Sequence, residues 1–403
     1  MASKSAHDYL EALAEELDIS ESRYDQAYGR YHSIGEWLNR DASSIKQFDP
    51  TIYVQGSFAF GTVIKPFTDM EEYDVDMVCE LRNLSKDDLS QEKLKKLVGS
   101  EIEAYRNANN MKKPMEERRR CWTLNYADGA QFHVDIVPAL PNSGWVRAML
   151  EQRNLDAQWA DTAIGITDNE VVNYSNISDD WPRSNPKGYL QWFKSRMAAQ
   201  LERKKIQLAE DLRAGVDDIP DYRVRTPLQS AIMILKRHRD RMFEDDKENN
   251  SPISIIITTL AGHAYNGEEI IADALFSILQ NMESFIEWDG QKYVIPNPSD
   301  PSENFADKWE EFPERREAFF SWLRQAREDF QSIANIYSRR TITESLSPRI
   351  GKELAEKALD RISVRGGPSS LLQGASAASA ASLASEPSFG DEPRVPTKPK
   401  GFA

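Results

Sequence analysis

Three acidic residues on two strand-like runs could bind divalent metal together. Asp74 and Asp76 lie in the run YDVDMV, and Asp135 lies between apolar neighbours in FHVDIV. Residues two apart on a strand point to the same face, with Cα atoms roughly 6.6 Å apart, so Asp74 and Asp76 could both bind one cation. Three carboxylates in a cleft of reduced dielectric repel one another strongly unless a cation lies among them. The sequence therefore predicts Asp74, Asp76 and Asp135 as a catalytic triad that binds Mg²⁺.

A turn about seventeen residues before the acidic pair could hold phosphate. A β-rich run ends at Gln55, Gly56 and Ser57 follow, and the next residues resemble a helix start. Glycine lets the backbone approach a phosphate, and free N–H groups at a helix N-terminus favour negative charge. Alone, this pattern is also typical of a structural turn. Its place before a strand of metal ligands favours a nucleoside triphosphate site at Gln55, Gly56 and Ser57.

This arrangement suits two-metal nucleotidyl transfer. We expect two Mg²⁺ ions, for which Mn²⁺ could substitute, roughly 3.5 to 4 Å apart and stabilising the entering and leaving oxygens. Asp135 could also take the proton of the acceptor hydroxyl. His133 lies two residues before Asp135, where a structural role and a place near the site are both open.

A basic helix further along the chain could hold the phosphate tail. In AIMILKRHRDRMF, Lys236 directly follows an apolar run, so its ammonium could reach the β- or γ-phosphate from the cleft wall. Ser254 begins the next expected helix and could donate from its N-terminus. The neighbouring Arg237, Arg239 and Arg241 are typical of a solvated face near a helix C-terminus, where cations suit the helix dipole.

Composition limits the class of protein. A chain of 403 residues favours two lobes, and a net charge of −15 with a pI near 5.0 argues against a surface that coats DNA or an anionic membrane. The two cysteines, Cys79 and Cys121, lie in apolar runs and are expected as buried, reduced thiols. No apolar stretch is long enough to span a bilayer, so we expect a cytoplasmic protein without a membrane partner.

The pattern along the chain predicts an α+β fold. Helical spacing covers residues 6–46, short β runs fill 50–140 around a helical interval at 90–110, and Asp128-Gly129 marks a hairpin turn. Residues 141–185 read as irregular. Helices are expected at about 187–212, 225–243, 252–265, 268–282 and 313–338. The predicted domains are a core with N-terminal helices at 1–185, a mainly helical lobe at 186–365, and a disordered tail at 366–403, where small polar residues and prolines cannot bury enough apolar surface.

The motifs resemble the bacterial cGAS/DncV-like nucleotidyltransferases (CD-NTases). The resemblance rests on QGSFAFGT, EEYDVDMV and FHVDIVPA, and on LKRHRD, PISIIITTLA and IPNPSDPSENFADKW, of which the last resembles a loop of 2′-5′ oligoadenylate synthases. It implies a bilobed, polymerase-β-like core with a mixed sheet, a long N-terminal helix and an oligoadenylate-synthase-like helical lobe. It also implies an enzyme that uses ATP, with GTP, to make a cyclic di- or trinucleotide for an effector in antiphage (CBASS) defence. The similarity favours the clade that makes cyclic trinucleotides.

The resemblance also bears on partners. In related operons an E1/E2-like ligase joins the synthase's carboxyl terminus to targets, which makes Ala403 a candidate conjugation site, while an inert tail or another operon-encoded regulator stays open. Two cysteines cannot form the zinc ribbon of the animal DNA sensor, so DNA activation is not expected. Two alternatives remain: a linear oligoadenylate synthase or adenylyltransferase acting on RNA, a protein or a small molecule, and a catalytically silent nucleotide sensor.

Overall fold

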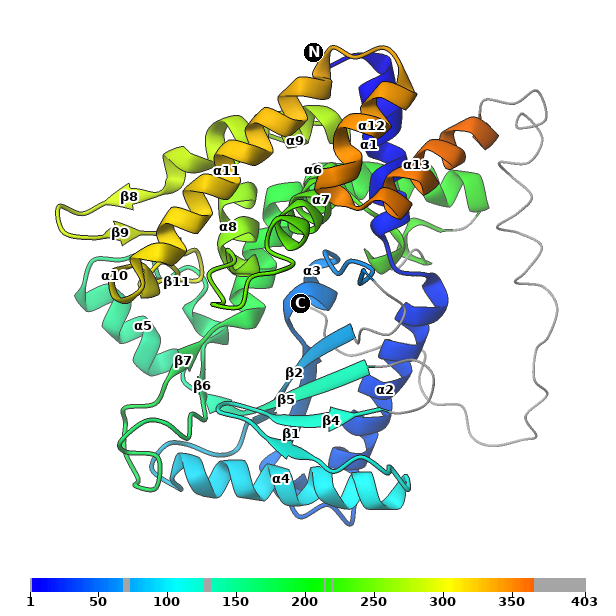
Figure 1. The fold of residues 1–403 in the computed structure, drawn as a ribbon. Helices are drawn as coiled ribbons and strands as arrows, with labels where there is room; N and C mark the ends of the chain where they lie inside the picture. The colour runs from blue at the N-terminus through cyan, green and yellow to red at the C-terminus, as the bar shows by residue number, and fades with distance from the viewer. Residues whose placement is uncertain (1, 68–72, 127–131, 214, 219–220, 366–403) are drawn as a thin grey trace, which may run out of the picture.

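The computed structural model describes residues 2–67, 73–126, 132–213, 215–218 and 221–365, arranged as a sheet-based lobe and a helical lobe (Figure 1). The principal helices are α1 (Lys4–Leu17), α2 (Glu21–Asn39), α3 (Gly56–Phe60), α4 (Gln91–Ala108), α5 (Ser143–Gln152), α6 (Pro186–Leu212), α7 (Pro227–Met242), α8 (Ser254–Ala264), α9 (Ile271–Asn281), α10 (Lys308–Glu311), α11 (Pro313–Ala334), α12 (Arg339–Ile350) and α13 (Lys352–Arg365). The strands are β1 (Pro50–Val54), β2 (Tyr73–Leu81), β3 (Glu116–Glu117), β4 (Trp122–Asn125), β5 (Phe132–Pro141), β6 (Ile164–Ile166), β7 (Arg183–Ser184), β8 (Glu287–Trp288), β9 (Tyr293–Val294), β10 (Pro296–Asn297) and β11 (Asp300–Asn304).

The main sheet is mixed, as the sequence predicts. Its strand order is β1-β2-β5-β4-β3, and β6 pairs with the end of β5 and with β7. β2 and β5 run parallel, whereas β1 and β4 are antiparallel to their neighbours. On β2, Val75, Met77 and Cys79 are buried in the core that α2 and α4 share with the sheet. Because side chains alternate along a strand, Asp74 and Asp76 lie on the opposite face.

The helical lobe is built around α7. Every residue of α7 from Pro227 to His238 is buried, and Thr226 and Gln229 form a capping box that satisfies the helix start. α1 also belongs to this core, because it packs against α7, α9, α12 and α13, whereas α2 packs on the sheet. The expected helical stretch 6–46 is thus two helices in two different cores. The division at residue 185 stays a prediction, and α1 contributes its apolar face to the part of the chain beyond that boundary.

Two regions differ from expectation. The stretch 141–185, expected as irregular, contains α5, β6 and β7. α12 and α13 extend the helices beyond residue 338, although Thr341, Thr343 and Pro348 lower the helix propensity of α12. α12 forms because Ile342, Leu346 and Ile350 are buried in the helical core. The Asp128-Gly129 turn and the tail 366–403 lie outside the described residues.

Backbone segment 60–65 forms one of the contacts between the two lobes. Side chains of α7 donate hydrogen bonds to three of its carbonyls: Gln229 Nε2 to Phe60 O at 2.8 Å, Lys236 Nζ to Thr62 O at 2.8 Å, and Arg237 Nη2 to Lys65 O. All three donors lie on buried residues. Buried carbonyls need such partners, so α7 and this segment fix one another.

We expect Gln229→Leu to lower the free energy of unfolding by roughly 2 kcal/mol, because it leaves the Phe60 carbonyl and the Thr226 N–H without their partners. Urea unfolding followed by circular dichroism measures this. The matched control is Gln280→Leu, since Gln280 is exposed on α9. Equal stability of the two variants would contradict the role assigned to this contact.

Candidate active site

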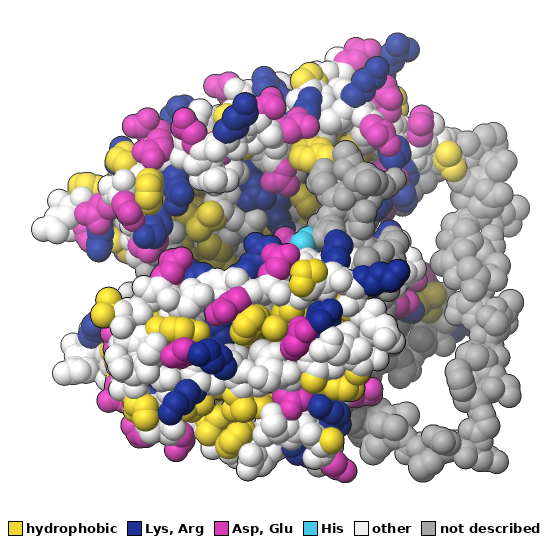
Figure 2. All heavy atoms as spheres, turned by 60° about the horizontal axis from the view of Figure 1, so that its bottom comes forward, with side chains coloured by type: hydrophobic (Ala, Val, Ile, Leu, Met, Phe, Trp, Pro, Cys, Tyr) yellow, Lys and Arg dark blue, Asp and Glu magenta, His cyan; other side chains and the backbone are white. Residues whose placement is uncertain are grey.

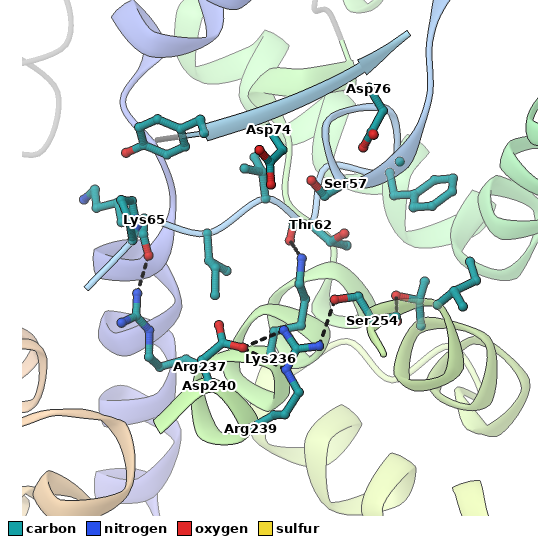
Figure 3. A pocket seen from close by; sticks show the side chains of 18 of the residues that line it. Ser57, Thr62, Lys65, Asp74, Asp76, Lys236, Arg237, Arg239, Asp240 and Ser254 are labelled. Atoms are coloured by element: carbon teal, nitrogen blue, oxygen red, sulfur yellow. Dashed lines mark hydrogen bonds and ion pairs between the residues drawn. The ribbon is translucent and has the colours of Figure 1, made fainter. Parts of the chain in front are cut away.

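A cavity of about 470 Å³ lies where the two lobes meet. α3, segment 62–67, β2, α7 and the start of α8 line it (Figure 3). Figure 2 shows the molecule hollowed between its lobes, with basic and acidic side chains together in the hollow. Six residues singled out from the sequence line the cavity: Gly56, Ser57, Asp74, Asp76, Lys236 and Ser254. Gln55 and Asp135 lie beside it rather than in its described lining.

Gly56 allows the acidic strand to approach the turn. Its φ is +66°, in the left-handed region that favours glycine. A Cβ at this position would run into Oδ2 of Asp76. The Gln55 N–H donates to Asp76 O at 2.8 Å, which ties the turn to β2 through the backbone. The Asp76 carboxylate is therefore held directly over the Gly56-Ser57 turn.

The three predicted carboxylates lie on one face of two adjacent strands. Asp76 and Asp135 are register partners in the parallel pair β2–β5, and His133 is the partner of Asp74. The pKa of Asp76 is raised to about 6, chiefly by burial and also by the negative charges of Asp135 and Asp74, against the opposing effect of Lys236. The Asp76 carboxylate is thus in an environment that disfavours its own charge.

The three carboxylates lie on neighbouring strands, but their side chains as positioned do not form a metal-binding site. Asp135 Oδ1 accepts a short hydrogen bond from Thr123 Oγ1 of β4. In the described part of the chain, no three His, Cys, Asp or Glu side chains are gathered closely enough to hold a metal ion as they stand. Metal binding by Asp74, Asp76 and Asp135 therefore stays a prediction, and the register of the two strands is the observation in its favour.

Lys236 lies in the cavity wall, as expected from the apolar run before it. Its side chain is only 7% exposed, and Nζ donates to Thr62 O (Figure 3). The pKa of Lys236 is lowered to about 8, chiefly by burial and also by the charge of nearby Arg239, while Asp240 and Asp76 oppose this. An ammonium has three N–H groups, so a hydrogen bond to Thr62 leaves two for other acceptors.

The basic residues around Lys236 are not the solvated face that the sequence pattern indicates. Arg237 and Arg239 both line the cavity. The Arg237 guanidinium stacks 4.1 Å from the centre of the Phe67 ring, and Arg239 Nη1 donates to Ser254 Oγ at 2.9 Å. Arg241 alone fits the expectation, because it is partly exposed and pairs with Glu244. The missed signal is the three-residue spacing of Lys236 and Arg239, which places both on one side of a helix.

Two other expectations can be compared with the structure, and a third concerns a residue beyond the described part of the chain. Cys79 and Cys121 are both buried free thiols, which confirms that prediction. None of the described helices is both long and apolar enough to cross a membrane. The candidate conjugation site, Ala403, lies outside the described residues.

Sequence comparisons place the chain in a family. Residues 50–138 match the family described as the nucleotidyltransferase domain of cyclic GMP-AMP synthase DncV-like proteins. The c-di-GMP synthase of Roseivirga ehrenbergii is 30% identical over 335 residues, which cover 82% of this chain and 80% of that protein. The cyclic dinucleotide synthase CdnG of Bradyrhizobium diazoefficiens is 26% identical over 317 residues, covering 75% of this chain and 70% of that protein.

Solved structures show the same fold. B. diazoefficiens CdnG in complex with GTP superposes with a TM-score of 0.65 at 21% identity, covering 89% of this chain and 99% of that one. The Vibrio cholerae dinucleotide cyclase DncV, in complex with ATP, GTP and 5MTHFGLU2, gives a TM-score of 0.56 at 14% identity, covering 89% of this chain and 99% of that one.

The fold and the sequence define a nucleotidyltransferase. The chain belongs to the DncV-like nucleotidyltransferases, the bacterial CD-NTases, which confirms the predicted family, the fold class and the assignment as an enzyme. The expected clade of trinucleotide synthases finds no support, because both curated relatives are named as dinucleotide synthases.

We expect Gly56→Ala to reduce nucleotide-product synthesis by about a hundredfold, because the added methyl group displaces Asp76 or the turn, and small misplacements in an active site have effects of that size. Turnover of radiolabelled NTP measures this. Gly35→Ala is the control, since nothing lies within 4 Å of the Cβ it would add on α2. Wild-type activity in Gly56→Ala would contradict the close approach of Asp76.

Proposed function

We propose that the protein converts two purine nucleoside triphosphates, GTP first among them, into a cyclic dinucleotide. One observation carries the proposal: the acidic strand, the Gly56-Ser57 turn and the buried ammonium of Lys236 share one cavity. The relatives support the substrate and the product, since one is named a c-di-GMP synthase and CdnG is described in complex with GTP. ATP is the second candidate substrate, because DncV is described with both ATP and GTP.

The proposed reaction is two successive nucleotidyl transfers. In the first, a ribose hydroxyl of one nucleotide attacks the α-phosphorus of the other. A new P–O bond forms, and the bond to the leaving oxygen breaks, so that pyrophosphate leaves with the bonding electron pair. In the second, a hydroxyl of the newly added nucleotide attacks the remaining α-phosphorus and closes the ring. Two triphosphates thus give one cyclic dinucleotide and two pyrophosphates.

The turn and the helical lobe hold the donor in this proposal. The backbone at Gly56 and the Ser57 hydroxyl approach its phosphates, because Gly56 leaves no side chain in the way. Lys236 donates its two remaining N–H groups to the phosphate tail while Thr62 O fixes its position. Ser254, at the start of α8, lines the same cavity and donates a further hydrogen bond. Gln55 acts through its backbone contact with Asp76.

The donor set fits a divalent cation. Carboxylate oxygens are the ligands that Mg²⁺ and Mn²⁺ prefer. Burial, and after it the negative charges of Asp135 and Asp74, raise the pKa of Asp76, and a cation would compensate that negative charge. Asp74, Asp76 and Asp135 would hold the metal, which when bound makes the acceptor hydroxyl more acidic and stabilises the entering and leaving oxygens. Asp135, the register partner of Asp76, would take the acceptor proton.

We also propose that the protein is a cytoplasmic enzyme and that its product activates an effector in antiphage defence. This proposal rests on membership of the family. Conjugation of Ala403 by an E1/E2-like ligase stays a prediction, tested by removing the last residues and assaying conjugation with the cognate ligase.

Incubation of the purified protein with all four NTPs and Mg²⁺ or Mn²⁺ tests the proposal. After phosphatase treatment, mass spectrometry should show a resistant cyclic dinucleotide that contains guanine. A linear ladder would favour an oligonucleotide synthase or an adenylyltransferase. Binding of GTP without consumption under every condition, including the presence of operon-encoded partners, would favour a silent sensor.

Neutralising Asp76 should have opposite effects on activity and on thermal stability. We expect Asp76→Asn to abolish turnover yet to unfold at a higher temperature than wild type in chelator, because it removes a buried charge next to two others. Mg²⁺ should raise the melting temperature of wild type more than that of the variant. Asp87→Asn, at an exposed position, is the control. An equal response of Asp76→Asn and wild type to Mg²⁺ would argue against a metal at this carboxylate.

A further inference from the structure

Arg239 clamps the start of α8 to α7. Its Nη1 donates to Ser254 Oγ and to Pro252 O, both at 2.9 Å, and its Nε donates to Asp240 Oδ1 at 2.8 Å (Figure 3). The side chain is 11% exposed, and Asp240 balances its charge through an ion pair of 2.6 Å. The planar guanidinium presents several donors in a fixed fork, so one residue can fix three acceptors at once.

The direction of the hydrogen bond to Ser254 has a chemical consequence. A hydroxyl has one proton and two acceptor lone pairs. Because Arg239 can only donate, Ser254 Oγ must accept, and its own proton stays available. Among the described residues, no acceptor takes that proton, and Ser254 lines the cavity. The residue before α8, Ile253, provides no side-chain cap for the first turn. Ile255 of this turn and Thr258 of the next also line the cavity.

Arg239 also fixes Ser254 relative to Lys236. The two basic residues are three positions apart on α7, which places them on one side of the helix, and both line the cavity. Thr62 O holds Lys236, and Arg239 holds Ser254. The spacing of the two donors is thus set by hydrogen bonds from neighbouring turns of one helix.

We propose that Arg239 is a positioning residue for the donor triphosphate: it orients the Ser254 hydroxyl and the first turn of α8 toward the β- and γ-phosphates. This inference rests on the proposed function, in which Ser254 binds the phosphate tail. Arg239 acts through Ser254, because its Nε donor is engaged by Asp240 and its Nη1 donors are engaged by Pro252 O and Ser254 Oγ.

Calorimetric titration of GTP and of GMP into variants tests this. We expect Arg239→Met to weaken GTP binding by about tenfold, the size of a lost hydrogen bond to a charged group, and to leave GMP binding unchanged because GMP lacks the β- and γ-phosphates. Ser254→Ala should show the same pattern. The double variant should bind GTP no more weakly than either single variant, because the two residues act as one unit. Arg241→Met, a partly exposed arginine on the same helix, is the control and should bind GTP as wild type does.

A second variant distinguishes the loss of these hydrogen bonds from a loss of folding. Arg239→Lys keeps the charge beside Asp240 but lacks the fork, and we expect it to melt like wild type and to bind GTP as weakly as Arg239→Met. Additive losses in the double variant, equal losses for GTP and GMP, or wild-type GTP affinity in Arg239→Lys would each overturn the inference. Since binding is measured apart from product formation, a protein that shows the expected affinities but makes no cyclic product would refute the proposed function alone.

Discussion

The site depends on the contact between the Asp76 carboxylate and the backbone at Gly56. The positive φ of Gly56 turns the chain sharply after β1, and the missing side chain leaves the space that Asp76 Oδ2 occupies. The same approach brings Asp76 among Asp74 and Asp135 in a buried position, which raises its pKa. The proposed phosphate-binding turn and the acidic strand β2 thus share one cavity because residue 56 is glycine.

α7 sets the second half of the site. It is buried along most of its length in the helical core, so its position is determined by packing. From this fixed helix, Gln229, Lys236 and Arg237 bind carbonyls of segment 60–65, and Arg239 binds the start of α8. The helical lobe therefore does not merely cover the active site. It places cationic donors opposite the acidic strand at distances that the core determines.

The sequence predicts the parts of the site that depend on local pattern. The alternation around Asp74 and Asp76, the Gly-Ser turn and the apolar run before Lys236 each place a residue in the cavity. It could not predict the hydrogen-bond partners of Arg237 and Arg239, because the acceptors Lys65 O and Ser254 Oγ come from other segments of the chain. The packing of α1 with α13 and the formation of α12 likewise depend on long-range burial, which overrides weak local propensity. The hydrogen bond from Thr123 to Asp135 is of the same kind, since it requires the pairing of β4 with β5.

In the proposed function, the three crowded carboxylates hold metal beside the donor triphosphate. Crystals grown with Mn²⁺ and a non-hydrolysable GTP analogue test this, because anomalous scattering identifies Mn²⁺ directly. We expect anomalous peaks within coordination distance of Asp74, Asp76 and Asp135, beside the triphosphate over Gly56 and Ser57. A bound analogue with Asp135 still on Thr123, and no peak near the three carboxylates, would contradict this proposal.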